Sequence, residues 1–89
     1  MKKTKTPDKH WNYRVLANQE HKVTTFGIHE VYYEHGKPVS YTEKSISPYG
    51  ESAKELKKCL KMMRRALKEP VIRCGKGFPK EFKNTKSKK

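Results

Sequence analysis

The sequence predicts an α+β fold: a three-stranded antiparallel meander followed by one amphipathic helix packed on one face, with flexible basic tails. Two patterns predict this order. Apolar and polar residues alternate in segments between residues 11 and 43, as in strands, and apolar residues recur at steps of three and four over residues 53–67, as in a helix. The chain then divides into a flexible basic arm (1–9), a β-β-β-α domain (10–72) and a flexible lysine-rich tail (73–89).

The first two strands are predicted by residue type as well as by alternation. Residues 11–17 place Trp, Tyr, Val and Ala at odd positions, hence on one face, and the polar residues 18–22 predict a turn. Residues 23–34 form the second strand, because β-branched and aromatic side chains lose freedom in a helix and fit a pleated sheet. This strand has one set of apolar residues on each face. We expect a bulge near Gly27, which would shift the alternation and reconcile the two sets.

Turn residues delimit the third strand. Gly36 supplies the positive φ that a tight turn requires, so His35-Gly36 predicts a hairpin. Residues 39–43 alternate again, and Pro38 stands at the start of this strand, where a missing backbone donor matters least.

Capping residues delimit the predicted helix. Ser52 and Glu55 have the spacing of a capping box, which predicts a helix that begins near Ala53, and Pro70 ends it by disfavouring helical geometry in the preceding residue. The apolar stripe of this helix consists of Ala53, Leu56, Leu60, Met63 and Leu67, widened by Cys59 and Ala66. The short apolar segment 71–74 is expected to lie beside the sheet or the helix.

The basic residues of the helix form the clearest candidate site. They recur on the side away from the apolar stripe and consist of Lys54, Lys58, Lys61, Arg65 and Lys68, with Lys57 and Arg64 beside them. Such a face could bind nucleic-acid phosphates and release counterions, and the alternative is a solvated face of good helix formers. The tail adds Lys76, Lys80 and Lys83 as candidate contacts. Lysine is more frequent than arginine, which favours backbone contact over base readout.

The net charge of +13 is unevenly distributed. Residues 1–9 carry +3, residues 10–50 are neutral, residues 51–69 carry +4 and residues 70–89 carry +6. The molecule is therefore expected to have a neutral sheet on one side and a cationic helix on the other.

The predicted sheet carries more aromatic residues than one helix can cover. The candidates for exposed aromatic residues are Trp11, Tyr13, Tyr32, Tyr33 and Tyr41. Exposed rings could stack on unpaired bases or anchor a protein partner. The neutral charge of this segment favours protein contact or self-association.

Neither metal binding nor catalysis is predicted. The four histidines and two cysteines lack the short spacings of zinc sites, and the neighbours His29 and Glu30 point to opposite faces of a strand. We therefore expect no enzymatic activity, no metal and no cofactor. The chain has neither a long apolar run nor the apolar stretch of a secretory signal, so we expect a cytoplasmic protein without a membrane partner and with free thiols at Cys59 and Cys74.

Residues 11–72 resemble a group of short, uncharacterised bacterial proteins. The segments that carry the resemblance are Trp11–Val15, Gly27–Tyr33, Gly36–Val39 and Ser47–Gly50. The resemblance implies a bacterial or phage source and brings no known activity with it. The basic helix and the lysine tail depart from the more acidic helix of that group, so a shared partner is not implied.

Two functions are consistent with these observations. The first is a small non-enzymatic protein that contacts nucleic-acid phosphates through the helix face and the tail. The alternative is an inhibitor or adaptor, encoded by a phage or a mobile element, that docks on a nucleic-acid-handling protein complex. It would bind an acidic protein surface or a ribonucleoprotein. Steep salt dependence favours the first function, and recovery of one specific protein after nuclease treatment favours the second.

Overall fold

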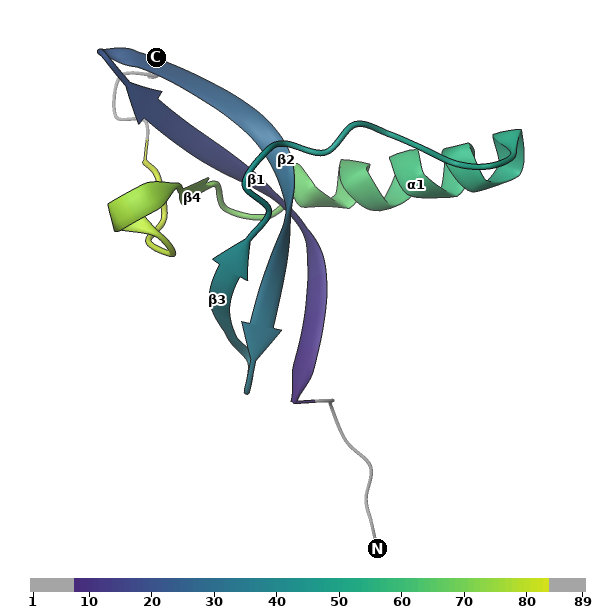
Figure 1. The fold of residues 1–89 in the computed structure, drawn as a ribbon, viewed down its shortest axis with the longest axis horizontal. Coiled ribbons are helices and arrows are strands. Elements are labelled where there is room, and N and C mark those ends of the chain that lie inside the picture. The colour runs from purple at the N-terminus through teal and green to yellow at the C-terminus, as the bar shows by residue number, and fades with distance from the viewer. Residues whose placement is uncertain (1–7, 84–89) are drawn as a thin grey trace, which may run out of the picture.

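The computed structural model describes residues 8–83 and has the predicted α+β class, but its sheet differs from the predicted meander. The elements are β1 (Lys9–Glu20), β2 (Val23–Glu34), β3 (Lys37–Tyr41), α1 (Ala53–Ala66), β4 (Ile72–Arg73) and the short 3-10 helix η1 (Gly75–Gly77). The strand order is β3-β2-β1-β4 (Figure 1), and β4 pairs with β1 in parallel. The prediction of a purely antiparallel three-stranded sheet was therefore wrong, because a fourth, parallel strand joins the free edge of β1.

Strands β1 and β2 form one long hairpin. The pairing runs without interruption from the Lys9–Glu34 pair to the turn. The two turn residues, His21 and Lys22, have positive φ values of 49° and 72°. A two-residue turn with this geometry matches the twist of the flanking strands. Strand β1 consequently continues to Glu20, and the polar turn that was predicted over residues 18–22 is confined to residues 21–22.

The prediction of a bulge near Gly27 was wrong, and this glycine has another role. The register shift lies instead between Tyr32 and Tyr33, where β2 pairs with β3. A Cβ atom on Gly27 would come within 2.8 Å of the Ser45 Cβ atom. Close by, the Ile46 amide donates a hydrogen bond to the Ile28 carbonyl at 2.7 Å. Glycine is needed here because the segment after β3 crosses close to β2.

Different elements cover the two faces of the sheet, so β1 is buried on both sides. One face carries the main hydrophobic cluster, which consists of Leu16, Val31, Tyr33 and Ile72 with the partly buried Tyr41, Cys74 and Phe78. Side chains alternate along a strand, so Val15 and Ala17 lie on the face opposite Leu16. These two residues are buried, as are Met63 and Ala66 of α1, which lies on that side.

The segment that follows α1 belongs to the fold, contrary to the predicted flexible tail at 73–89. The Cys74 amide donates to the Ala17 carbonyl at 3.0 Å, and the Phe82 amide donates to the Val71 carbonyl at 2.7 Å. Ile72 is 4% exposed and belongs to the main cluster. The predicted boundary after residue 72 is therefore wrong for residues 73–83. Most of the predicted N-terminal arm and the last residues of the predicted tail lie outside the described residues.

Helix α1 begins where its capping residues predict. The Ser52 Oγ atom accepts a hydrogen bond from the Glu55 amide at 3.1 Å. The Glu55 carboxylate accepts one from the Glu51 amide at 3.0 Å, one residue earlier than the capping-box pattern requires. The regular helix ends at Ala66, before Pro70.

The helix lies on the sheet with only part of its length. In Figure 1 its N-terminal half extends beyond the sheet, next to the loop that follows β3. Met63 and Ala66 are its buried residues, both in the C-terminal half. Leu60 is 47% exposed and Leu67 is 68% exposed. The apolar stripe therefore packs on the sheet mainly through the C-terminal half of the helix.

The packing of Cys74 leads to a testable titration. Burial raises the pKa of the Cys74 thiol, and a hydrogen bond with Tyr41 partly opposes this rise. In a Cys59→Ser variant, the rate of thiol labelling should reach half of its maximum at a higher pH in the folded protein than in urea. The stabilisation linked to this pKa is present below the ordinary thiol pKa and is lost as the pH rises through the raised value. Equal midpoints in both conditions would contradict the packing of Cys74 against the core.

Candidate nucleic-acid interface

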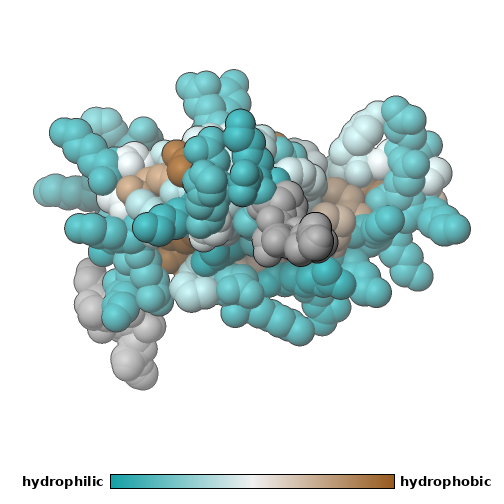
Figure 2. Space-filling model, turned by 90° about the horizontal axis from the view of Figure 1, so that it is seen from below, coloured by the Kyte–Doolittle hydropathy of each residue, from teal (hydrophilic) through white to brown (hydrophobic). Residues whose placement is uncertain are grey.

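The candidate interface is a basic ridge on α1 and the turn after it. We use this name for seven residues: Lys54, Lys57, Lys58, Lys61, Arg64, Arg65 and Lys68. All seven are exposed. A helical rise of about 1.5 Å per residue spaces charges that are three or four residues apart by about 4.5–6 Å along the axis. Figure 2 shows that hydrophilic residues cover most of the surface on the side that it presents, with small hydrophobic areas between them.

The ridge has no ionic partners within residues 8–83. The ion pair found in this part of the chain joins His35 to Asp8, with 3.7 Å between the imidazole Nδ1 and the carboxylate. The nearest acidic residue in the helix, Glu55, accepts a hydrogen bond from the Glu51 amide. The cations of the ridge are therefore free to pair with an external anion.

The ridge also opposes helix stability. Like charges three and four residues apart repel one another and destabilise a helix, and Lys54, Lys58 and Lys61 have this spacing. Arg64 and Arg65 in the last turn are the exception, because cations there interact favourably with the helix dipole. A bound polyanion would relieve the repulsion along the rest of the ridge.

The predicted tail contacts do not join the ridge. Lys76 lies in η1, and Lys80 and Lys83 follow it in the segment that pairs with β4. All three are exposed. In Figure 1 this segment lies on the other side of the sheet from the projecting end of α1. The structure thus separates two groups of cations that were predicted to form one site.

The five aromatic candidates fall into two groups. Tyr33 is 8% exposed, and Tyr41 packs 4.7 Å from Phe78 between ring centroids, so both contribute to the main cluster. The prediction that they are exposed was wrong, because the C-terminal segment covers their face. Trp11 is 44% exposed, and the half-buried Tyr32 is its partner across the β1–β2 pair. Tyr13 is also half-buried and contacts α1.

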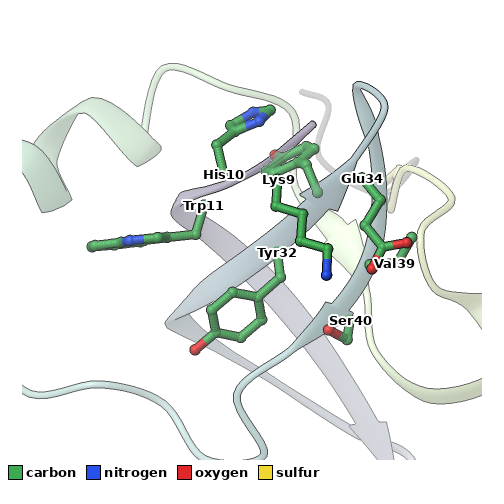
Figure 3. Close-up of a pocket in the computed structure, with 8 residues that line it drawn as sticks. Lys9, His10, Trp11, Tyr32, Glu34, Val39 and Ser40 are labelled. Carbon is green, nitrogen blue, oxygen red and sulfur yellow. The ribbon is translucent and has the colours of Figure 1, made fainter. Parts of the chain in front are cut away.

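Trp11 and Tyr32 line a shallow hollow of about 260 Å³ at the end of the sheet (Figure 3). Val39 and Ser40 of β3 also line it, and its charged lining residues are Lys9 and Glu34. In Figure 3 the indole of Trp11 points away from the strands. Tyr13 packs edge-to-face with Trp11, with 5.2 Å between the ring centroids, and the exposed part of the indole could accept a nucleobase or another flat group by stacking.

The tyrosine hydroxyls near this hollow stay protonated at neutral pH. Tyr32 donates a hydrogen bond to the Glu30 carboxylate at 2.6 Å, which raises the pKa of Tyr32. Burial raises the pKa of Tyr13, whose hydroxyl lies 3.9 Å from the Cys59 sulfur, and the hydrogen bond between them adds to the rise. Both shifts stabilise the neutral phenols, so these side chains offer aromatic surface and hydrogen-bond donors rather than negative charge.

The buried histidine of the sheet has a structural role. His29 is 7% exposed, and its Nδ1 atom lies 2.8 Å from the Thr42 carbonyl oxygen. Its neighbour Glu30 contacts Tyr32, so the two side chains have separate partners. In the part of the chain that the structure covers, no three His, Cys, Asp or Glu residues are grouped as a metal site would require. No helix there is long and apolar enough to cross a membrane.

Two further exposed residues were absent from the predicted site. Phe26 is 54% exposed and Tyr49 is 70% exposed. Alternation placed Phe26 on a sheet face, but the sequence holds no signal that α1 would leave this part of the face open.

Comparisons with known proteins give no functional assignment, so the assignment rests on the geometry of the structure. No protein-family model, no curated protein and no solved structure matches this chain. The resemblance of residues 11–72 to short bacterial proteins stays a prediction.

Proposed function

We propose that this chain is a non-enzymatic nucleic-acid-binding protein that contacts phosphates through the basic ridge of α1. The observation that carries the proposal is a set of seven exposed cations without a carboxylate partner among residues 8–83, on a helix that projects from the sheet. A projecting cationic helix can approach a phosphate backbone without steric hindrance from the rest of the domain. The tail cations on the opposite side act as a second, weaker contact.

The proposed contacts are mainly with the backbone of the nucleic acid. Eight of the ten candidate cations on α1 and the tail are lysines, and lysine binds phosphate as a point charge. Of these ten, only Arg64 and Arg65 could form the bidentate contacts that read guanine. We therefore expect affinity with little sequence preference.

Salt dependence tests the proposal directly. If five ridge cations contact phosphates of a DNA duplex, the logarithm of the affinity should fall with the logarithm of salt concentration with a slope of about −4.5. Between 50 and 200 mM salt this slope corresponds to roughly a 500-fold loss of affinity. Fluorescence anisotropy of a labelled duplex with nuclease-treated protein measures the slope. The absence of binding at low salt, or a slope shallower than about −1, would refute the proposal.

A further inference from the structure

An apolar groove separates α1 from the segment after β3. It is lined by Leu60 of α1 and by Leu67 directly after this helix, by Ile46 and Pro48 of the segment after β3, and by Phe26 and Ile28 of β2. The groove has a volume of about 560 Å³, which lies within the range of ligand sites, about 300–1,000 Å³. It is separate from the Trp11 hollow, with which it shares no lining residue.

The exposure of these apolar side chains is the main reason to consider a partner. Leu67, Phe26 and Leu60 are 68%, 54% and 47% exposed although they lie next to one another around one groove. One side of Phe26 is covered by Phe82, with 5.6 Å between the ring centroids. Clustered apolar exposure of this kind marks interaction sites. In a chain with few hydrophobic residues, leaving several of them in water requires an explanation.

The charges around the groove indicate the chemistry of its occupant. Arg64 is its one charged lining residue. Lys57 lies three residues before Leu60 on the same helix, so Lys57 and Arg64 make the α1 edge of the groove cationic. A second copy of this chain would bring another molecule of net charge +13 and another cationic edge, which disfavours self-association. An occupant with carboxylates flanking an apolar face is complementary.

We propose that this groove docks an acidic amphipathic helix of a protein partner. The apolar residues of that helix, at positions i, i+3 or i+4, and i+7, would lie between Leu60, Leu67 and Ile46, as in other helix-in-groove complexes. Its carboxylates would pair with Arg64 and Lys57. Leu60 and Leu67 are seven residues apart, about 10 Å along α1, which matches two turns of a bound helix. The docking requires no nucleic acid, but it shares Arg64 and Lys57 with the phosphate contacts proposed above, so an acidic helix and a nucleic acid would compete for these two cations.

A synthetic peptide pair tests this proposal with the full-length protein. The probe is a peptide of about 14 residues, long enough for marginal helix formation, with leucines on one helical face and glutamates elsewhere. The matched control has the same composition with the leucines distributed around the helix. We expect the amphipathic peptide to bind at least about ten-fold more tightly than the control. Backbone amide shifts in the NMR spectrum should change at Phe26, Leu60 and Leu67.

Variants of the groove complete the test. Leu60→Gln with Leu67→Gln should weaken binding of the amphipathic peptide by about ten-fold or more, because two apolar contacts are lost. Leu67→Gln alone serves if the double variant alters the circular dichroism spectrum. Equal binding of both peptides would show attraction by charge alone and overturn the proposal. Unchanged binding by the variants, or a concentration-dependent dimer of the free chain that the variants abolish, would overturn it as well.

Discussion

Replacement of Ile72 by alanine is expected to destabilise the protein by about 3 kcal/mol, within the range of roughly 2–5 kcal/mol for truncation of a buried isoleucine. Ile72 is 4% exposed and packs with Leu16 and Val31. A domain of this size has a small total stability, so the loss is a large part of it. Denaturant unfolding measured by circular dichroism should show a lower midpoint with an unchanged slope.

The control for this variant is Val23→Ala. Val23 is 60% exposed at the start of β2, and we expect its replacement to change the free energy of unfolding by no more than about 0.5 kcal/mol.

A chain that ends at Pro70 is a more severe test of whether the C-terminal segment belongs to the core, because it lacks β4, Phe78 and the cover of the main cluster. We expect no cooperative unfolding transition from it. A chain of this length that unfolds with the midpoint of the full protein would show that the C-terminal segment is not part of the core.

Reversal of three charges on the ridge is expected to abolish most binding to a DNA duplex. The combined variant Lys58→Glu, Lys61→Glu and Arg65→Glu removes three phosphate contacts and adds three repulsive charges. We expect a loss of affinity on the order of 100-fold at low salt and a salt slope that is smaller by about three. The new glutamates lie three or four residues from the remaining cations and also from one another, so attraction and repulsion along the helix oppose each other. The circular dichroism spectrum of the variant should match that of the unchanged protein if the fold is retained.

A matched variant separates the site from the total charge. Lys22→Glu, Lys37→Glu and Lys44→Glu produce the same change in net charge, and all three lysines are exposed, in the β1–β2 turn, at the start of β3 and after β3. We expect this variant to lose far less affinity in the same anisotropy titration, because its substitutions lie outside the ridge. An equal loss in both variants would mean that net charge, and not the ridge, determines binding.

Local chemistry made several elements predictable from the sequence. The second strand was expected at residues 23–34 and is observed at those residues, because its β-branched and aromatic content is high throughout. The start of α1 was predictable because the contact between Ser52 and Glu55 spans one helical turn. The exposure of the ridge followed from the helical period, since its cations lie opposite the residues that α1 buries.

Other features depended on contacts between distant parts of the chain. The two residues of β4 have no periodicity of their own, and they form a strand because the free edge of β1 offers hydrogen bonds and Leu16 offers apolar surface. This pairing buries Tyr33, which alternation alone could not assign to an inner or outer face. It also places Lys76 away from the ridge.

The sequence by itself determined the α+β class, the long strands, the capped helix and the position of its basic face, because each depends on residues close together in the chain. Only the tertiary structure decided which face of the sheet the C-terminal segment covers and how much of α1 rests on the other face. The physical reason is that a thin core must be completed by whichever apolar segments can reach it. Ile72 and Phe78 reach one face, and the exposed leucines of α1 remain beside the groove.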